Sequence, residues 1–268
     1  MSLVPAALDG LLLLVIAATV GLATFRWAVL ERLKGEVAFP MLAFPALRRA
    51  WALGWAVTLV AILLPPMRMA VESVQRFGPD ALFQGRAMLA TRWGIGLMAE
   101  VAAANLLGIG LMIAGAQGRR AGWTLIGVAA ALATLVPGLS LPALGASGPT
   151  AIETLSATVY VAAVSACVGG LGVILLVGLP ALREADVPRQ LEGTSDLEAA
   201  LAACYRGVAV IGIALAAASG AAAARIRLGS WSALTESGYG RTLLIELALV
   251  GAVTIVGASL TSRHREVG

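Results

Sequence analysis

Residues 154–182 read TLSATVYVAAVSACVGGLGVILLVGLPAL and contain no Asp, Glu, Lys, Arg or His. Four other stretches are equally free of charge, and they cover residues 50–67, 101–118, 121–152 and 207–224. A run of about 18 or more apolar residues is long enough to cross a hydrocarbon core of roughly 30 Å as a helix. The runs are continuous rather than alternating, so the sequence predicts an all-α, polytopic transmembrane bundle.

The composition of the whole chain agrees with this fold class. Of 268 residues, 59% are hydrophobic and 13% are charged, and the mean hydropathy is +0.91. Soluble domains carry about 25% charged residues, so the charge of this chain must be confined to short loops. The sequence has no Ser/His/Asp set, phosphate-binding loop, Cys-x-x-Cys pair or zinc-ligand spacing, and we therefore expect no enzymatic activity.

Seven spans are expected, in a single transmembrane domain over residues 1–268. They lie near residues 7–30, 50–71, 93–116, 121–142, 156–180, 204–225 and 240–261. Proline removes a helix hydrogen bond, so Pro65 and Pro66 are expected to kink or end the second span. For the same reason Pro137 and Pro142 are expected to break the fourth span near its end.

Basic residues predict the orientation of the chain. With seven spans, ten Lys and Arg residues fall on one side and seven on the other. This bias favours an outward N-terminus and a cytoplasmic C-terminus. The pI of about 9.7 then reflects topology, and the expected partner is the lipid bilayer rather than nucleic acid. Arg26, near the inward end of the first span, is expected to extend to the headgroups.

The sequence also contains an internal similarity. Residues 93–100, WGIGLMAE, align with residues 239–246, YGRTLLIE, at an offset of 146. Each block begins with an aromatic residue and a glycine, and each ends on a glutamate, Glu100 or Glu246. A duplication would give two parallel repeats of four and three helices, about 1–145 and 146–268. Coincidence between two apolar helices is the alternative.

Several short blocks together resemble the copper-resistance D (CopD/PcoD) family. They are residues 231–235 (WSALT), Tyr239-Gly240, Leu243-Leu244, residues 88–94 (MLATRWG), residues 168–171 (VGGL) and Cys204-Tyr205-Arg206. The resemblance covers most of the chain. It implies a multi-pass protein of the bacterial inner membrane that moves or tolerates copper taken from the periplasmic side. A periplasmic copper carrier or other membrane subunits are the partners it implies.

The chain departs from the pattern of that family at its ligands. Tyr160 and Pro142 stand where the family carries histidines, and Glu246 replaces a basic residue. The only histidine is His264, between Arg263 and Arg265, where it reads as part of a cytoplasmic basic cluster. The eighth helix typical of the family is absent as well.

Thioether sulfur remains as a possible ligand for copper, because Cu(I) is a soft ion that accepts methionine. The candidate metal ligands are Met67, Met69, Met88 and Met98, all near the outward ends of the second and third spans. Apolar packing is the alternative role of these methionines.

Glu100 and Glu246 are the candidate intramembrane ionisable residues. A carboxylate within a span costs about 2.5–3.5 kcal/mol on insertion scales, so it usually faces the interior and has a partner. An ion pathway, a proton relay, a binding pocket or a plain interhelical hydrogen bond would each fit. Two functions therefore follow from the sequence: copper handling, with Cu(I) as the ion, or a non-transporting interaction subunit of a larger membrane complex.

Overall fold

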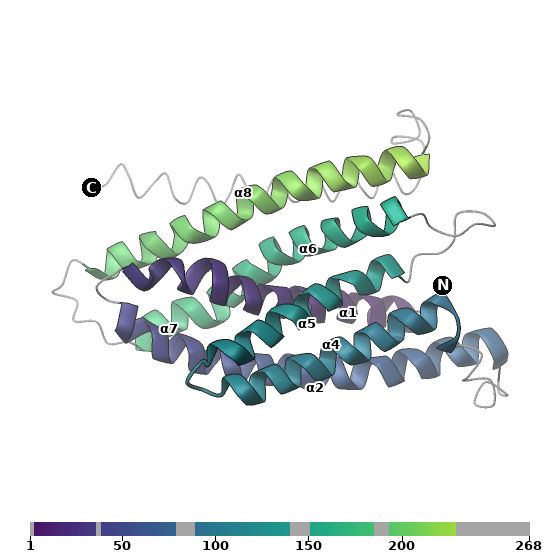
Figure 1. Cartoon of the computed structure of the whole chain (residues 1–268), viewed down its shortest axis with the longest axis horizontal. Coiled ribbons are helices and arrows are strands. Elements are labelled where there is room, and N and C mark those ends of the chain that lie inside the picture. The colour runs from purple at the N-terminus through teal and green to yellow at the C-terminus, as the bar shows by residue number, and fades with distance from the viewer. Residues whose placement is uncertain (1–2, 36–38, 79–88, 140–150, 185–192, 229–268) are drawn as a thin grey trace.

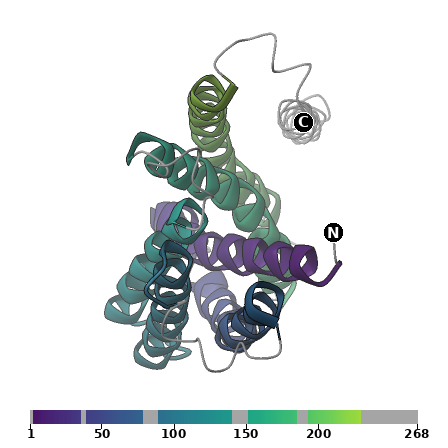
Figure 2. The ribbon, with the colours of Figure 1, turned by 90° about the vertical axis from the view of Figure 1, so that its right-hand side faces the viewer.

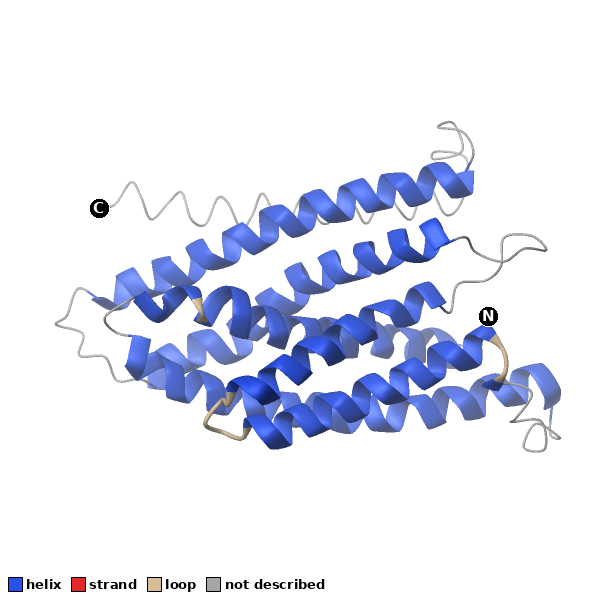
Figure 3. Ribbon diagram, in the orientation of Figure 1, coloured by secondary structure: helices blue, strands red, loops and turns tan. Residues whose placement is uncertain are grey.

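The apolar runs of the sequence form long helices, and all regular structure in the described parts of the chain is helical (Figures 1 and 3). The structure is a computed structural model, and it describes residues 3–35, 39–78, 89–139, 151–184 and 193–228. The long helices are α1 (Leu3–Thr24), α2 (Phe39–Phe77), α4 (Arg92–Ala114), α5 (Arg120–Leu139), α6 (Ala151–Val173) and α8 (Gly193–Leu228). Shorter turns extend α1 and α6, namely η1 (Phe25–Leu30), η2 (Arg32–Gly35), η4 (Ile174–Gly178) and α7 (Leu179–Glu184).

Six helical segments of the described chain are long and apolar enough to cross a bilayer, which makes the chain a polytopic membrane protein. They are Val4–Gly35, Phe39–Gln75, Arg92–Ala114, Arg120–Leu139, Ala151–Glu184 and Ala199–Ala222. The first six spans expected from the sequence are thereby confirmed as apolar helices. The expected seventh span, residues 240–261, lies outside the described residues. The block 239–246, which aligns with residues 93–100, lies outside them as well.

The helices run side by side along the long axis of the molecule (Figure 1). We name its two ends after acidic residues that lie there. Helices α1, α4 and α6 begin at the Asp9 end, on the right in Figure 1, and α2, α5 and α8 begin at the Glu31 end. Helix α1 packs against α2, α5 and α6, whereas α8 packs mainly against α6 at the edge of the described bundle (Figure 2).

Glycine allows α1 and α6 to approach at the backbone. A Cβ atom placed on Gly169 of α6 would lie 1.8 Å from the carbonyl oxygen of Ala17 in α1. A Cβ atom on Gly21 would lie 2.3 Å from the carbonyl oxygen of Gly169. Small residues at such crossings let helices pack closely in lipid, where apolar side chains gain nothing by leaving the solvent.

Pro65 and Pro66 do not end α2, so of the two outcomes expected from the sequence, a kink or an end, the end is wrong. The helix continues from Phe39 to Phe77 through Pro45, Pro65 and Pro66. Pro66 follows Pro65 directly, so the two missing N–H groups fall in one turn, and neighbouring helices can compensate for such a local loss within a membrane. Helix α5 passes through Pro137 and is described up to Leu139, and Pro142 lies outside the described residues.

Buried apolar side chains form two clusters along the bundle. The cluster toward the Glu31 end contains Phe25, Leu111 and Trp123. The cluster toward the Asp9 end joins α1, α2, α4 and α5 through Leu12, Ile16, Leu64, Ala103 and Val136. This second cluster forms the apolar surroundings of the ionisable residues described next.

Candidate functional site

A buried ion pair joins α2 to α4 near the Asp9 end. Nη1 of Arg68 donates a hydrogen bond of 2.6 Å to Oε2 of Glu100. The two side chains are 11% and 6% exposed. Glu100 lies two turns inside α4, whose start is fixed by Thr91: its hydroxyl oxygen accepts a hydrogen bond of 3.1 Å from the backbone N–H of Gly94. The sequence-based prediction that Glu100 faces the interior is confirmed.

Arg68 also binds a second carboxylate, on α1. Its Nη2 lies 3.1 Å from Oδ1 of Asp9, whose side chain is 64% exposed. We call Asp9, Arg68 and Glu100 the polar triad. It links three helices, and because two carboxylates share one guanidinium, it carries one unbalanced negative charge when all three groups are ionised.

Each member of the polar triad lies inside a span, a few residues from the end nearest to it. Asp9 is five residues inside its span, Arg68 is seven residues from the end of its span, and Glu100 is eight residues inside its span. At 1.5 Å per residue these positions correspond to roughly 8, 10 and 12 Å. The triad therefore connects the exposed Asp9 with a carboxylate in the interior.

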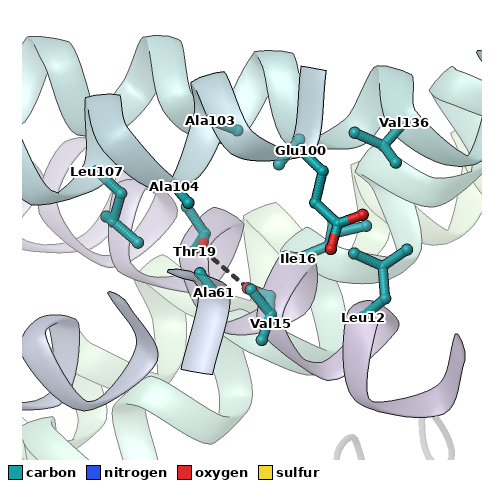
Figure 4. A pocket seen from close by; sticks show the side chains of 11 residues that line it. Leu12, Val15, Ile16, Thr19, Ala61, Glu100, Ala103, Ala104, Leu107 and Val136 are labelled. Atoms are coloured by element: carbon teal, nitrogen blue, oxygen red, sulfur yellow. Dashed lines mark hydrogen bonds between the residues drawn. The ribbon is translucent and has the colours of Figure 1, made fainter. Parts of the chain in front are cut away.

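The second oxygen of Glu100 faces an apolar cavity. Oε1 is buried and has no hydrogen-bond partner among the described residues. The cavity has a volume of about 20 Å³, and α1, α2, α4 and α5 line it (Figure 4). Among the described residues that line the cavity, Thr19 is the only polar one besides Glu100. The hydroxyl of Thr19 donates a hydrogen bond of 2.8 Å to the carbonyl oxygen of Val15. This space is close to that needed by one water molecule.

The methionines predicted as metal ligands flank the polar triad in sequence. Met67 and Met69 precede and follow Arg68 on α2, and helical geometry turns their side chains to different sides of that helix. Met98 precedes Glu100 by two residues on α4 and is 55% exposed, while Met67 is 53% exposed. Met88 lies outside the described residues. A copper site built from all four methionines therefore stays a prediction.

The remaining predicted positions divide between the described and undescribed parts of the chain. Tyr160 lies on α6, whereas Glu246, Pro142 and His264 fall outside the described residues. Within the described ranges, no group of three or more His, Cys, Asp or Glu side chains is placed to hold a metal ion.

Arg26 does not extend outward from the bundle, as the sequence suggested it would. It is 6% exposed, and its Nη1 donates to Oε2 of Glu31 at 2.7 Å. The intervening residues form the π-helical turn η1, and a wider turn places residues five apart on one face. Glu31 also binds Lys34 and Arg120, so it joins the end of α1 to the start of α5.

Sequence reasoning missed Asp9 and used Arg68 only in the count of basic residues that predicts the orientation. Both lie inside the spans of the structure, and Asp9 is the only acidic residue between Leu3 and Thr24. An ionisable residue within a span usually has a partner inside the bundle. The positions of Asp9 and Arg68 within apolar spans could therefore have identified both as candidate site residues. The pairing itself depends on how α1, α2 and α4 pack.

Comparison of the chain with models of protein families, with curated proteins and with solved structures finds no match.

Proposed function

We propose that this chain handles copper in the membrane, binding Cu(I) at the Asp9 end of the bundle. The observation that carries the proposal is the polar triad, which has one unbalanced negative charge and has methionines near two of its members in the sequence. Two carboxylates and one guanidinium attract a monovalent cation, and thioether sulfur is a ligand that suits Cu(I). Met67 and Met69 adjoin Arg68, and Met98 lies within one turn of Glu100.

Contacts between the segments that resemble the copper-resistance D family support the same proposal. Tyr205 of α8 donates a hydrogen bond of 2.5 Å to the carbonyl oxygen of Cys167 on α6. Cys167 directly precedes the VGGL block, and a Cβ atom on Gly170 would lie 3.4 Å from the ring of Tyr205. Two of the blocks that carry the resemblance therefore meet at one place in the bundle.

In this proposal the polar triad attracts the ion and the thioethers coordinate it. The apolar lining of the cavity beside Glu100 offers no sulfur, so the metal is expected at Met67, Met69, Met88 and Met98 rather than in the cavity. The basic residues predict an outward N-terminus, which would place the Asp9 end on the periplasmic side of a bacterial inner membrane. In that orientation the Asp9 end takes up copper from the periplasm.

Metal analysis of the purified full-length chain, with and without added Cu(I), tests the proposal. We expect stoichiometric Cu(I) that survives desalting, and we expect Zn²⁺ added at the same concentration to be removed, because thioether ligands favour the softer ion. A protein that retains no Cu(I) contradicts the proposal.

A second function is favoured by the surface of α8. Only 17% of its apolar span is buried against described residues, compared with 33–50% in the other five spans. Val210, Ile211 and Leu215 are 59%, 60% and 47% exposed. A non-transporting subunit of a larger membrane complex would use such a face for a partner.

Substitution of that face tests the second function. The variant V210A/I211A/L215A should lower the mass of the complex extracted from native membranes in mild detergent, while copper tolerance stays unchanged. Ile152 and Leu155 on α6 are 66% and 64% exposed and give the matched control, I152A/L155A. An extracted mass that is equal in all three proteins excludes α8 as the interaction face.

A further inference from the structure

The Glu31 end carries a continuous group of basic side chains that the proposed function does not use. On α2, Arg48 and Arg49 both contact Glu184 of α7, the latter at 2.9 Å between Nε and Oε2. Across the bundle, Arg120 at the start of α5 contacts Glu31. Two carboxylates thus each hold several cations, and neither cluster is neutral.

The turn between α4 and α5 joins these two clusters. Gly118 has a φ of 71°, and a Cβ atom placed on it would lie 2.7 Å from Cδ1 of Leu47. This contact brings the turn, which continues into Arg119, against the segment of α2 that continues into Arg48. Arg119 is exposed and has no ion pair among the described residues.

We define the arginine belt as the two acids Glu31 and Glu184, the basic residues that contact them, and Arg119 on the turn. It consists of Arg26, Lys34, Arg48, Arg49, Arg119, Arg120, Glu31 and Glu184. Six basic and two acidic side chains give it a net charge of +4. Much of that charge is exposed: Arg119 is exposed, and the side chains of Lys34, Arg48, Arg49 and Arg120 are 42%, 53%, 39% and 67% exposed.

Next to the arginine belt, toward the middle of α2 and α4, the surface is aromatic and apolar. Trp51 and Trp55 follow Arg49 within two turns of α2, and their rings meet edge to face at 6.2 Å. The indole N–H of Trp51 donates to the carbonyl of Leu111 on α4 at 3.0 Å. Next to Leu111, Met112 is 71% exposed. Tryptophan is typical of the membrane–water interface, so the belt lies at headgroup level.

We propose that the arginine belt binds the phosphodiester group of an anionic phospholipid, whose acyl chains lie along α2 and α4. Guanidinium groups donate paired hydrogen bonds to phosphate oxygens, and the belt presents exposed arginines with an unbalanced positive charge. Basic clusters between spans at the membrane surface recognise anionic headgroups in the same way. The inference does not depend on copper.

Thermal unfolding of the full-length chain in mixed micelles tests the inference. Phosphatidylglycerol should raise the Tm of the wild-type protein, and phosphatidylcholine at the same mole fraction should not. The variant R48Q/R119Q should lose that increase and keep its Tm without lipid, because Arg49 still holds Glu184 and Arg119 has no ion pair to lose. Arg206 of α8 is exposed at the same end outside the belt, so R206Q is the matched control and should respond like wild type.

Each contrary outcome overturns the inference in its own way. Equal increases with both lipids would mean that the headgroup charge is not recognised. An equal loss in R206Q would mean that diffuse charge, rather than the belt, attracts the lipid. The same increase with inorganic phosphate or glycerol phosphate, and no lipid, would assign the site to a soluble anion. If R48Q/R119Q unfolds at a lower Tm without lipid, the R119Q single variant must still lose part of the increase, and a full response from it contradicts the inference.

Discussion

Arg68 on α2 and Glu100 on α4 lie 2.6 Å apart in the apolar half of the bundle next to the Asp9 end, and both side chains are almost fully buried. The pair fixes the register of α2 against α4, because neither helix can slide or rotate without separating the two charges in a medium of low dielectric constant. Asp9 extends the same contact to α1.

Removal of one charge of the pair should cost more stability than removal of both. In R68M the carboxylate of Glu100 loses its buried partner, and we expect a loss of about 3–5 kcal/mol. The double variant R68M/E100Q leaves no uncompensated buried charge, since Asp9 is 64% exposed, and should recover a large part of that loss. Unfolding of the three proteins in mixed detergent micelles measures the difference.

The control for this comparison is R206M, which removes an exposed arginine of α8 that has no ion pair in the described chain. Its stability should equal that of the wild type. If the double variant is less stable than R68M, the charge pair does not hold α2 and α4 together in the way described.

Glycine at the crossing of α1 and α6 should tolerate no side chain. Gly169→Ala places a methyl group against the Ala17 carbonyl, so we expect a loss of about 1–3 kcal/mol from overpacking. Gly172 lies in the same helix with nothing within 4 Å of an added Cβ, and Gly172→Ala should be neutral or stabilising by up to about 1 kcal/mol. Equal melting temperatures for the two variants would contradict the close crossing.

Much of this fold is predictable, because membrane-spanning helices can be recognised in a sequence by their length and apolar composition. Six of the expected spans appear as helices, and Glu100 is buried as its position suggested. The end of α2 was not predictable, since α2 continues for eleven residues beyond Pro66. A helix within a bundle retains its path where packing compensates for a lost hydrogen bond, and the sequence does not display that packing.

The partners of the ionisable residues could be predicted only in part. A buried glutamate is expected to have a partner, but the sequence does not show which residue it is. Arg68 is 32 residues from Glu100 in the sequence, and Asp9 is 59 residues from Arg68. Such contacts depend on which helices are neighbours. The case of Arg26 is local, yet it depends on the π-helical turn η1, for which residues 25–30 carry no recognisable signal.

Reporter fusions should establish the orientation of the spans. A reporter that is active only in the periplasm should be inactive when fused at Gly118, in the turn between α4 and α5, and inactive at Gly268. Fused at Gly145 it should be active, because the basic residues place that segment outward. Activity at Gly268 would contradict the seven-span topology.

Asp9 should influence copper binding through charge alone. Asp9→Asn removes the unbalanced negative charge of the polar triad, while Arg68 keeps its contact with Glu100. A change of about 1 kcal/mol, or roughly fivefold weaker Cu(I) binding, is expected for a charge several ångströms from the ion in a partly hydrated site. Competition with a Cu(I) chelator measures the affinity. An unchanged Cu(I) affinity would show that the charge of the polar triad does not contribute to copper binding.

A Cu(I) titration of three forms of the full-length chain tests the proposed function most directly. The first is the wild type, the second replaces Met67, Met69, Met88 and Met98 with leucine, and the third replaces Met41 and Met112. The last two methionines lie toward the Glu31 ends of α2 and α4 and are 54% and 71% exposed, so they are matched to Met67 and Met98, which lie on the same two helices and are 53% and 55% exposed. We predict stoichiometric binding by the wild type and the Met41/Met112 variant, and none by the fourfold variant. Stoichiometric binding by the fourfold variant, or no binding by the wild type, would contradict copper handling at the Asp9 end.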